Sequence, residues 1–380
     1  MKTYVTLFLL LLLSFTNAWP QDKGVWTAFF DADYKRGFKD ASGKVMIEPK
    51  FTGFTRAIKF DQIIMGMEYT PEEGFEDYYL LKNGRQFGHD SVYYPGLTFY
   101  CESEGLIPFM AESGVGMFNG QGKIAIPAMY NDVSACRNGY IVALAGAEKK
   151  WDGEYSYWDG GINSLIDRNN KIIINNFNLE DDVDFYSAQV TDNKPTDPNR
   201  IAYKANDGKC HSFIDNKKLF TEFLEKELLA NPMPDKLIAA SYAKLVYWDD
   251  GSDGWIWRKN AGFIKDNFEL IAQRLLEIKK PDADFLYSYP SSIQLPDDLE
   301  DEFNTYKNNC GDFNSDKHPI RKIIITHIEK DKNGNPVMAG PHAPVATKEG
   351  YAFYQESFTF LKTESGFKLV SLSLHDAEFK

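Results

Sequence analysis

The chain has 380 residues, of which 43% are hydrophobic and 26% charged, and its formal net charge is −13. This composition is that of a globular protein rather than a disordered one, and the length suffices for two domains at roughly 100–200 residues each. Because the acidic excess repels phosphate backbones and anionic lipids, we expect no nucleic-acid partner.

The first 18 residues have the layout of a secretory signal peptide. Lys2 precedes an apolar run from Leu7 to Leu13, and small residues lead to Ala18, where we expect cleavage. The apolar run is shorter than the ~20 residues that a membrane-spanning helix needs. We therefore predict an exported protein, periplasmic or extracellular, with no membrane insertion after the signal is removed.

A sequence pattern recurs through residues 19–217. Residues 36–51 and 116–130 share a Gly, then Asp or Asn, then Gly-Lys, alternating apolar residues, Pro and an aromatic residue. Weaker copies cover residues 79–85, 165–174 and 201–211. Each copy is typical of a β-hairpin, in which two short strands meet at a Gly or Asn with positive φ. We expect Pro49 and Pro127 to end the second strand, because proline cannot donate to a ladder.

The repeats resemble a known family. The resemblance rests on Gly37-Phe38 with Asp40, Gly43-Lys44, Ile47 and Pro49, and on Gly105-Leu106 ahead of Gly116, which together look like WG repeats. The name-giving Trp-Gly pair reads Arg36-Gly37 and Val115-Gly116 here. The resemblance implies a mainly β array of stacked antiparallel hairpins, solenoid or propeller-like, in an exported protein that binds other proteins. No catalytic residues belong to the motif.

Residues 218–380 predict an α+β domain, with helices before an antiparallel β-meander. Apolar residues recur at helical spacing from Phe220 to Leu228 and from Ile264 to Ile278, and another helix is expected after Pro296. Strands are predicted over residues 320–328, 351–361 and 367–374. This layout is loosely similar to nuclear-transport-factor-like and cystatin-like domains, which implies helices resting on a curved sheet.

Motifs for catalysis, a metal or a cofactor are not visible in the sequence. The four cysteines lack the close spacing of a zinc or redox site. Cys101 and Cys136 occupy similar positions in successive repeats and form the candidate disulfide, whereas Cys310 is expected to be a buried thiol. None of the six histidines, His327 and His342 included, is spaced with another as metal ligands are.

Two aromatic clusters built around Asp-Gly turns are the candidate interaction surfaces. Their rings either pack inward beside ordinary turns or stand exposed, where they would stack on a sugar or anchor a protein. The first cluster contains Trp151, Tyr155, Tyr157 and Trp158, and the second contains Trp248, Trp255 and Trp257.

We therefore expect a non-catalytic protein without a cofactor, whose repeat array binds another protein at a bacterial envelope. Two alternatives stay open. One is carbohydrate binding or hydrolysis at the aromatic loops, and the other is small-ligand binding in the C-terminal domain.

Overall fold

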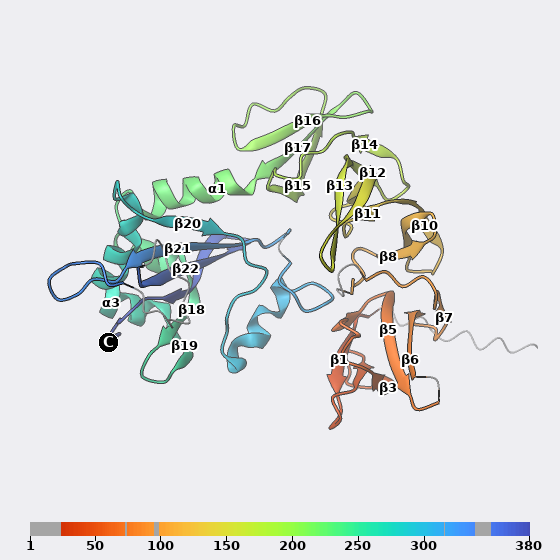
Figure 1. The fold of residues 1–380 in the computed structure, drawn as a ribbon, viewed down its shortest axis with the longest axis horizontal. Helices are drawn as coiled ribbons and strands as arrows, with labels where there is room; N and C mark the ends of the chain where they lie inside the picture. Colours follow the sequence, from red (N-terminus) through yellow and green to blue (C-terminus); the bar gives the residue numbers. More distant parts are fainter. Residues whose placement is uncertain (1–23, 73, 95–98, 315, 339–350) are drawn as a thin grey trace, which may run out of the picture.

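The computed structural model of the protein describes residues 24–72, 74–94, 99–314, 316–338 and 351–380. The predicted signal peptide and the loop that carries His342 lie outside these ranges. An N-terminal array of sheets leads into a C-terminal domain with one mixed sheet and several helices (Figure 1). Within the described ranges, no helix is both long and apolar enough to cross a bilayer.

The array consists of four antiparallel sheets that follow one another along the chain. Their strand orders are β4-β1-β2-β3-β5-β6-β7, β10-β9-β8, β11-β12-β13-β14 and β15-β17-β16. The strands are β1 (Trp26–Phe30), β2 (Arg36–Lys39), β3 (Val45–Phe51), β4 (Lys59–Phe60), β5 (Ile63–Thr70), β6 (Gly74–Leu81), β7 (Gln86–Phe87), β8 (Leu106–Ala111), β9 (Gly114–Asn119), β10 (Ile124–Tyr130), β11 (Asp132–Val133), β12 (Tyr140–Asp152), β13 (Tyr155–Asp167), β14 (Ile172–Ile174), β15 (Val183–Thr191), β16 (Arg200–Lys204) and β17 (Cys210–Asp215).

One tight turn recurs at the predicted hairpins. Between β2 and β3, the N–H of Gly43 donates to the carbonyl of Asp40 at 3.0 Å, and the N–H of Asp40 donates to the carbonyl of Lys44 at 2.9 Å. The Asp40 carboxylate also accepts from the N–H groups of Ser42 and Lys44, at 2.9 and 3.0 Å. Gly43 has a φ of +86°, a conformation that favours glycine. The turn therefore favours an Asp or Asn at its first position and a Gly or Asn at its fourth.

Other copies of this turn use the same bonds. Asn119 accepts the N–H of Gly122, and Asp167 accepts that of Asn170, and in both cases the side-chain Oδ1 accepts two further N–H groups. Three more copies were not predicted from the sequence. They cover residues 31–35, 308–312 and 331–335.

The strands beside the turn also match between repeats. In β2–β3, Phe38 pairs with Ile47 and Arg36 with Phe51, with two shifts of register. The equivalent residues of β9–β10 pair in the same way, with shifts at the same places. The predicted hairpin repeat is therefore confirmed, because residues 36–51 and 116–130 share one strand register and one turn.

The prediction that proline ends the second strand is wrong. Pro49 lies inside β3 and Pro127 inside β10, between paired residues that flank a register shift. A residue at such a bulge has no ladder partner for its N–H, so proline is tolerated there.

The bulge also explains why the repeat keeps its glycine. A Cβ on Gly37 would lie 2.6 Å from the carbonyl oxygen of Ile47, and one on Gly116 would lie 2.4 Å from that of Ile126. Any side chain at these positions would collide with the bulged strand, so glycine alone permits the close approach.

Neighbouring sheets share their hydrophobic cores. In β6, Tyr78 belongs to the core of the first sheet, and Tyr79 belongs to the core between the first and second sheets. In β12, Ile141 belongs to the core between the second and third sheets, and Tyr140 belongs to the core between the third and fourth sheets. Because side chains alternate between the two faces of a strand, the strands at these junctions bury residues on both sides. The units therefore depend on their neighbours for burial, as repeats in a solenoid do.

The array is an open arc. Figure 1 shows its strands running from β1 through β10 to β16, where α1 leads away to the C-terminal domain. Among the described residues, no strand of the first sheet pairs with a strand of the fourth. The ring-shaped alternative is therefore not adopted.

The C-terminal domain has a six-stranded sheet in the order β19-β18-β23-β22-β21-β20, in which β18 and β23 run parallel. Its strands are β18 (Ser241–Asp249), β19 (Gly254–Lys259), β20 (Phe285–Ser288), β21 (Ile320–Ile328), β22 (Phe353–Thr363) and β23 (Gly366–Ser373). Its helices are α1 (Asn216–Glu222), the π-helix η2 (Phe223–Leu228), α2 (Pro234–Ala239), α3 (Asn260–Leu276) and the 3-10 helices η3 (Glu277–Lys279) and η4 (Asp297–Tyr306).

Both faces of this sheet are covered. One face packs Phe358 and Phe360 of β22 against the helices, including Phe220 and Ile271. The opposite face packs Val246, Leu361 and Val370 against residues 293–313, which include η4. β21 has the predicted bounds, and β22 and β23 differ from the prediction by one or two residues. The strands β18, β19 and β20 were not predicted, and they lie among the helices instead of after them. The element after Pro296 is a 3-10 helix, although its apolar residues are buried as expected.

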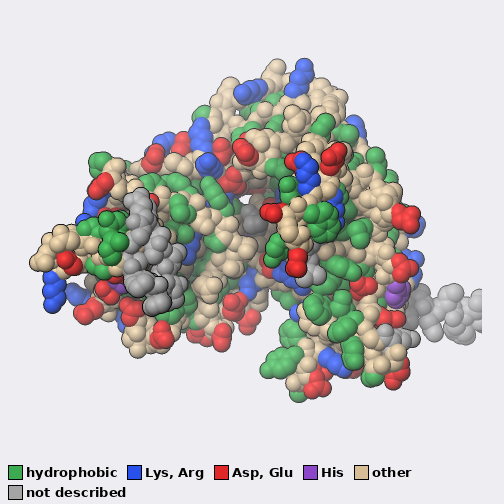
Figure 2. All heavy atoms as spheres, in the orientation of Figure 1, with side chains coloured by type: hydrophobic (Ala, Val, Ile, Leu, Met, Phe, Trp, Pro, Cys, Tyr) green, Lys and Arg blue, Asp and Glu red, His purple; other side chains and the backbone are tan. Residues whose placement is uncertain are grey.

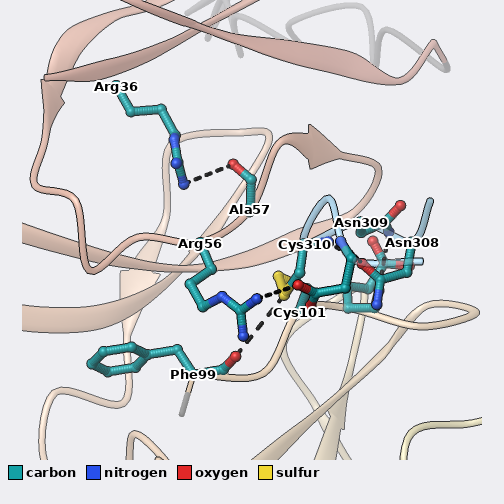
Figure 3. Close-up of a disulfide and its surroundings, with 10 residues drawn as sticks. Arg36, Arg56, Ala57, Phe99, Cys101, Asn308, Asn309 and Cys310 are labelled. Atoms are coloured by element: carbon teal, nitrogen blue, oxygen red, sulfur yellow. Dashed lines mark hydrogen bonds and ion pairs between the residues drawn. A yellow bond between two sulfur atoms is a disulfide. The ribbon is translucent and has the colours of Figure 1, made fainter. Parts of the chain in front are cut away.

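The predicted disulfide is wrong. Cys101 of the array is bonded to Cys310 (Figure 3), which therefore is not a free thiol as predicted. Cys136 is a buried free thiol. Cys310 sits in the tight turn at residues 308–312, which projects from the C-terminal domain onto the array. The repeat spacing could not reveal this partner, because the two cysteines are 209 residues apart and meet only through the tertiary fold.

Polar contacts surround this disulfide. The backbone N–H of Ile58 donates to the carbonyl of Asn309 at 2.8 Å, and Arg56 forms an ion pair with Asp312 at 2.5 Å. Further along the array, Arg137 forms an ion pair with Asp316 at 2.8 Å. We call residues 297–314 and 316–318 the docking segment, because they join the C-terminal sheet to the inner side of the arc.

The close approach at the repeat glycine predicts a stability effect. Gly116→Ala should lower the free energy of unfolding by about 1–3 kcal/mol, because its Cβ overlaps the bulged strand. Gly262→Ala in α3 meets no atom within 4 Å and should stabilise the chain, by up to about 1 kcal/mol. Chemical denaturation of both variants measures the difference. Equal midpoints would contradict the role given to the bulge.

The disulfide assignment predicts a specific labelling pattern. Burial and the nearby Glu104 raise the pKa of Cys136 to about 12, so its thiol stays protonated and unreactive at neutral pH. Cys210 is a free cysteine and is partly exposed, whereas Cys101 and Cys310 are bonded to each other. Iodoacetamide should therefore modify Cys210 in the native protein and spare the other three cysteines. Non-reducing peptide mapping should recover Cys101 joined to Cys310, and a peptide joining Cys101 to Cys136 would refute the assignment.

Candidate functional site

The hairpin of β12 and β13 extends well beyond the sheet that it belongs to. The two strands pair from Tyr140 with Asp167 to Asp152 with Tyr155, whereas β11 and β14 cover only the base of the hairpin. Residues 146–161 are largely exposed, and we call them the aromatic arm.

Glycines mark the place where the arm leaves the sheet. Gly146, Gly160 and Gly161 all have positive φ, between 70° and 80°. The pairing passes from Ala145 opposite Ile162 to Ala147 opposite Gly160, so the ladder skips one residue on each strand here. The register is the same on both sides of this gap, so the two strands continue as one hairpin beyond the sheet. The Gly160-Gly161 pair was a sequence signal for this positive-φ stretch that the prediction did not use.

The arm carries the first predicted aromatic cluster on its two faces. Trp151 is 65% exposed and Tyr155 is 83% exposed. The ammonium group of Lys149 lies 5.2 Å from the ring of Trp151 and 5.9 Å from that of Trp158. On the opposite face, Lys150 forms an ion pair with Asp159. The inward-packing alternative is therefore wrong for this cluster.

A hollow of about 600 Å³ lies between the arm and the second sheet of the array. Its wall combines rings with the flexible side chains of two methionines. The hollow is lined in part by Tyr93, Tyr94, Met110, Met129, Tyr157 and Trp158.

Polar groups at the floor of this hollow are partnered. The hydroxyl of Tyr93 donates to Asp132 at 2.8 Å. Burial raises the pKa of Asp132 above its usual value, and burial together with the nearby Asp132 raises that of Tyr93. The hollow therefore offers rings and methionine side chains over a floor whose polar groups are already paired.

Exposed rings continue from the hollow onto the first sheet. Tyr94 contacts Phe99 at 5.3 Å between ring centroids, Phe99 contacts Phe54 at 6.0 Å, and Phe54 contacts Phe75 at 6.3 Å. Tyr69 and Phe75 lie 4.9 Å apart. Except for Phe99, these rings are 43–62% exposed. We call this chain of rings, together with the aromatic arm, the aromatic stripe.

The part of the stripe on the first sheet was missed by sequence reasoning. Its rings come from three separated stretches of the chain, so they form no cluster in the sequence. Figure 2 shows hydrophobic side chains gathered on the visible face of the array. An apolar surface of this kind is unusual on a protein without a partner.

The second predicted cluster lies in the β18–β19 hairpin of the C-terminal domain and does not join the first. Trp248 and Trp255 pack edge to face at 5.7 Å, and the indole N–H of Trp248 donates to Asp250 at 2.9 Å. Trp257 donates to Asp298 at 3.0 Å. Trp255 and Trp257 pack against the core beneath η4. For this cluster, the inward-packing alternative is the one that the structure supports.

Comparison with known families identifies the repeat. Residues 116–151, from β9 to the first strand of the aromatic arm, match the model described as WG containing repeat. The chain carries a WG repeat. The equivalent turn and register at residues 36–51 extend the same architecture to the first sheet. No curated protein and no solved structure matches the chain.

The exposure of the arm predicts that its rings add little to the stability of the WG-repeat array. Trp151→Ala should change the free energy of unfolding by no more than about 0.5 kcal/mol, because the ring remains in water in the folded state. Phe109→Ala should cost about 3–5 kcal/mol, because Phe109 is buried and stacks on Phe118 at 4.0 Å. Denaturant titration of the two variants provides the comparison, and a large loss for Trp151→Ala would show that the arm is part of the core.

Proposed function

We propose that the protein is an exported, non-catalytic interaction protein, and that its WG-repeat array binds another protein through the aromatic stripe. The observation that carries this proposal is the set of exposed rings on the aromatic stripe, which, apart from the buried Phe99, lie outside the cores of the array. Aromatic and methionine side chains are enriched at protein interfaces, where they bury large areas with little loss of conformational entropy.

The inner side of the arc is already occupied, which favours the stripe as the partner surface. The docking segment contacts connections beside the first three sheets, at Ile58, Glu102 and Arg137. A partner of the array must therefore either displace this segment or bind elsewhere. The stripe requires no displacement.

Export is supported by two independent features. The N-terminal 18 residues have the layout of a signal peptide. The Cys101–Cys310 disulfide is of a kind that persists in oxidising compartments outside the cytosol. A periplasmic or extracellular location would also bring the stripe into contact with envelope proteins.

Carbohydrate binding is the second candidate, because Trp and Tyr rings also stack on sugars. The exposed Trp158 beside the hollow is the residue that would serve this role. The arm presents rings on two faces and the hollow adds methionine side chains, so the surface is less like a flat sugar platform than like a protein interface.

Binding measurements on variants distinguish protein binding from carbohydrate binding. The mature protein is immobilised and exposed to envelope extract from its own source, and captured proteins are then titrated individually. A triple variant, Trp151→Ala, Tyr155→Ala and Trp158→Ala, should weaken a true partner at least about 30-fold, since hot-spot residues contribute about 2 kcal/mol or more. The control is Leu286→Ala with Tyr289→Ala, which removes two hydrophobic side chains, 49% and 51% exposed, from the C-terminal domain.

The same proteins are applied to a glycan array. Binding of a defined glycan that is lost in Trp158→Ala would replace the protein-partner proposal by the carbohydrate one. Equal loss of the protein partner in the stripe variant and in the control would also refute the proposed surface.

A further inference from the structure

The aromatic arm has a free strand edge. The pairing of β11 with β12 stops at Leu144, before the arm begins. From Ala147 to Asp152, β12 pairs with β13 alone among the described residues. The other side of β12 therefore carries backbone N–H and C=O groups that no strand uses. An edge of this kind is a template to which another chain can add a strand.

The side chain of Asn131 shows which groups face this edge. Its Oδ1 accepts the backbone N–H of Ala147 at 2.8 Å, and its Nδ2 donates to the carbonyl of Ala147 at 3.0 Å. The side-chain amide thus bonds Ala147 as one residue of a neighbouring strand would. Because backbone groups alternate in direction along a strand, Lys149 and Trp151 face the same edge, whereas Lys150 faces β13.

The hollow between the arm and the second sheet borders this edge. Asn131 and Lys149 both line it, and so does Trp158, which lies opposite Lys149 in the hairpin. Side chains alternate between the two faces of a strand, so a strand added beside Lys149 would direct every second side chain toward the hollow. The edge offers hydrogen bonds and the hollow offers apolar contact, and this combination suits an extended peptide.

The charges beside the edge indicate which kind of segment fits it. Two lysines and four carboxylates lie on the arm, the carboxylates on Glu148, Asp152, Glu154 and Asp159. Lys150 is paired with Asp159, and Lys149 lies over two aromatic rings. The described lining of the hollow adds Glu112 and Asp132, and its only cation is Lys149. Carboxylates therefore outnumber cations both on the arm and in the hollow, which favours a basic segment.

We propose that the free edge of β12 binds an extended segment of the partner protein, rich in Lys or Arg, by adding it as a strand. This inference rests on the proposed function, because it states how the partner of the aromatic stripe is held. The segment forms backbone hydrogen bonds with Lys149 and Trp151. Its cationic side chains lie near the carboxylates of the arm and on the faces of exposed rings such as Tyr155, where a cation is favoured.

A second copy of this chain fits the edge less well. The arm carries two more carboxylates than lysines, and the whole chain has a net charge of −13. Two copies therefore repel each other where their arms would pair, whereas a basic segment is attracted to the same place.

The first test uses the mature full-length protein with two acetylated and amidated peptides, Lys-Val-Lys-Val-Lys-Val and Glu-Val-Glu-Val-Glu-Val. In an NMR titration, the Lys–Val peptide should bind at least about tenfold more tightly than the Glu–Val peptide. The bound peptide should slow hydrogen exchange at the amides of Lys149 and Trp151 at least about fivefold, and leave Lys150 unchanged, because Lys150 already faces β13. Absent binding, equal affinities, or unchanged exchange at Lys149 would overturn the proposal.

Proline substitutions locate the pairing. Lys149→Pro removes an N–H that faces the edge, where a strand tolerates proline, and should weaken the Lys–Val peptide at least about tenfold. Lys149→Ala removes the same side chain but keeps the N–H, and should change binding less than about threefold. Ser156→Pro is the matched control, because Ser156 lies opposite Trp151 and faces the other edge of the arm. A loss in Ser156→Pro as large as in Lys149→Pro would refute pairing at β12.

A second measurement leaves the protein unaltered, because Lys149→Pro could distort the arm. A Lys–Val peptide that is N-methylated at every residue keeps its charge and side chains, but its residues donate no backbone hydrogen bond. It should bind at least about tenfold more weakly than the unmethylated peptide. Equal binding would show that side chains alone are recognised, and would refute strand addition.

The partner captured from envelope extract distinguishes failure of this inference from failure of the proposed function. If the triple variant of the arm loses the partner while Lys149→Pro binds it as the unaltered protein does, the stripe is the surface and strand addition is refuted. If the triple variant keeps the partner, the proposed function itself fails. Sedimentation of the protein alone tests the remaining occupant, since a dimer that Lys149→Pro abolishes would assign the edge to a second copy and refute the partner segment.

Discussion

The array depends on the burial of side chains from both faces of its shared strands. Tyr78 and Tyr79 are neighbours in β6 and are both buried, but in different cores. A single hairpin unit would leave one of these rings in water, so the units cannot be stable one at a time. The repeated turn and the glycine at the bulge are the local devices that let such units stack in one register.

An open array of this kind leaves its two ends and its inner side exposed to solvent unless another segment packs against them. The C-terminal domain meets that need in part, because α1 continues directly from the last sheet and the docking segment returns to the first. The docking contacts are mainly polar, with ion pairs such as Arg137–Asp316, so the disulfide is the strongest constraint on the junction. This arrangement leaves the aromatic stripe outside the contacts between the array and the C-terminal domain.

Local patterns predicted local structure well. Asp40 with Gly43, and Asn119 with Gly122, predicted hairpins because each residue type satisfies a need within its own turn. Tyr34 was missed because a tyrosine at positive φ, here 57°, is rare and carries no signal. Exposure was not predictable in the same way. Trp151 and Trp255 occupy similar Asp-Gly surroundings, yet one is in water and the other rests on a core that comes from residues far along the chain.

The sequence did not predict β18, β19 and β20, which lie among the helices. By itself it determined the hairpin repeat at residues 36–51 and 116–130, and the bounds of β21, β22 and β23 to within two residues. Those features arise from hydrogen bonds and side-chain alternation within a few residues. Only the tertiary structure decided that Cys101 meets Cys310 and that Phe54 and Tyr94 continue the surface of the arm. Each of these depends on where distant segments come to rest, which is set by the packing of whole sheets and is not encoded in any one stretch of residues.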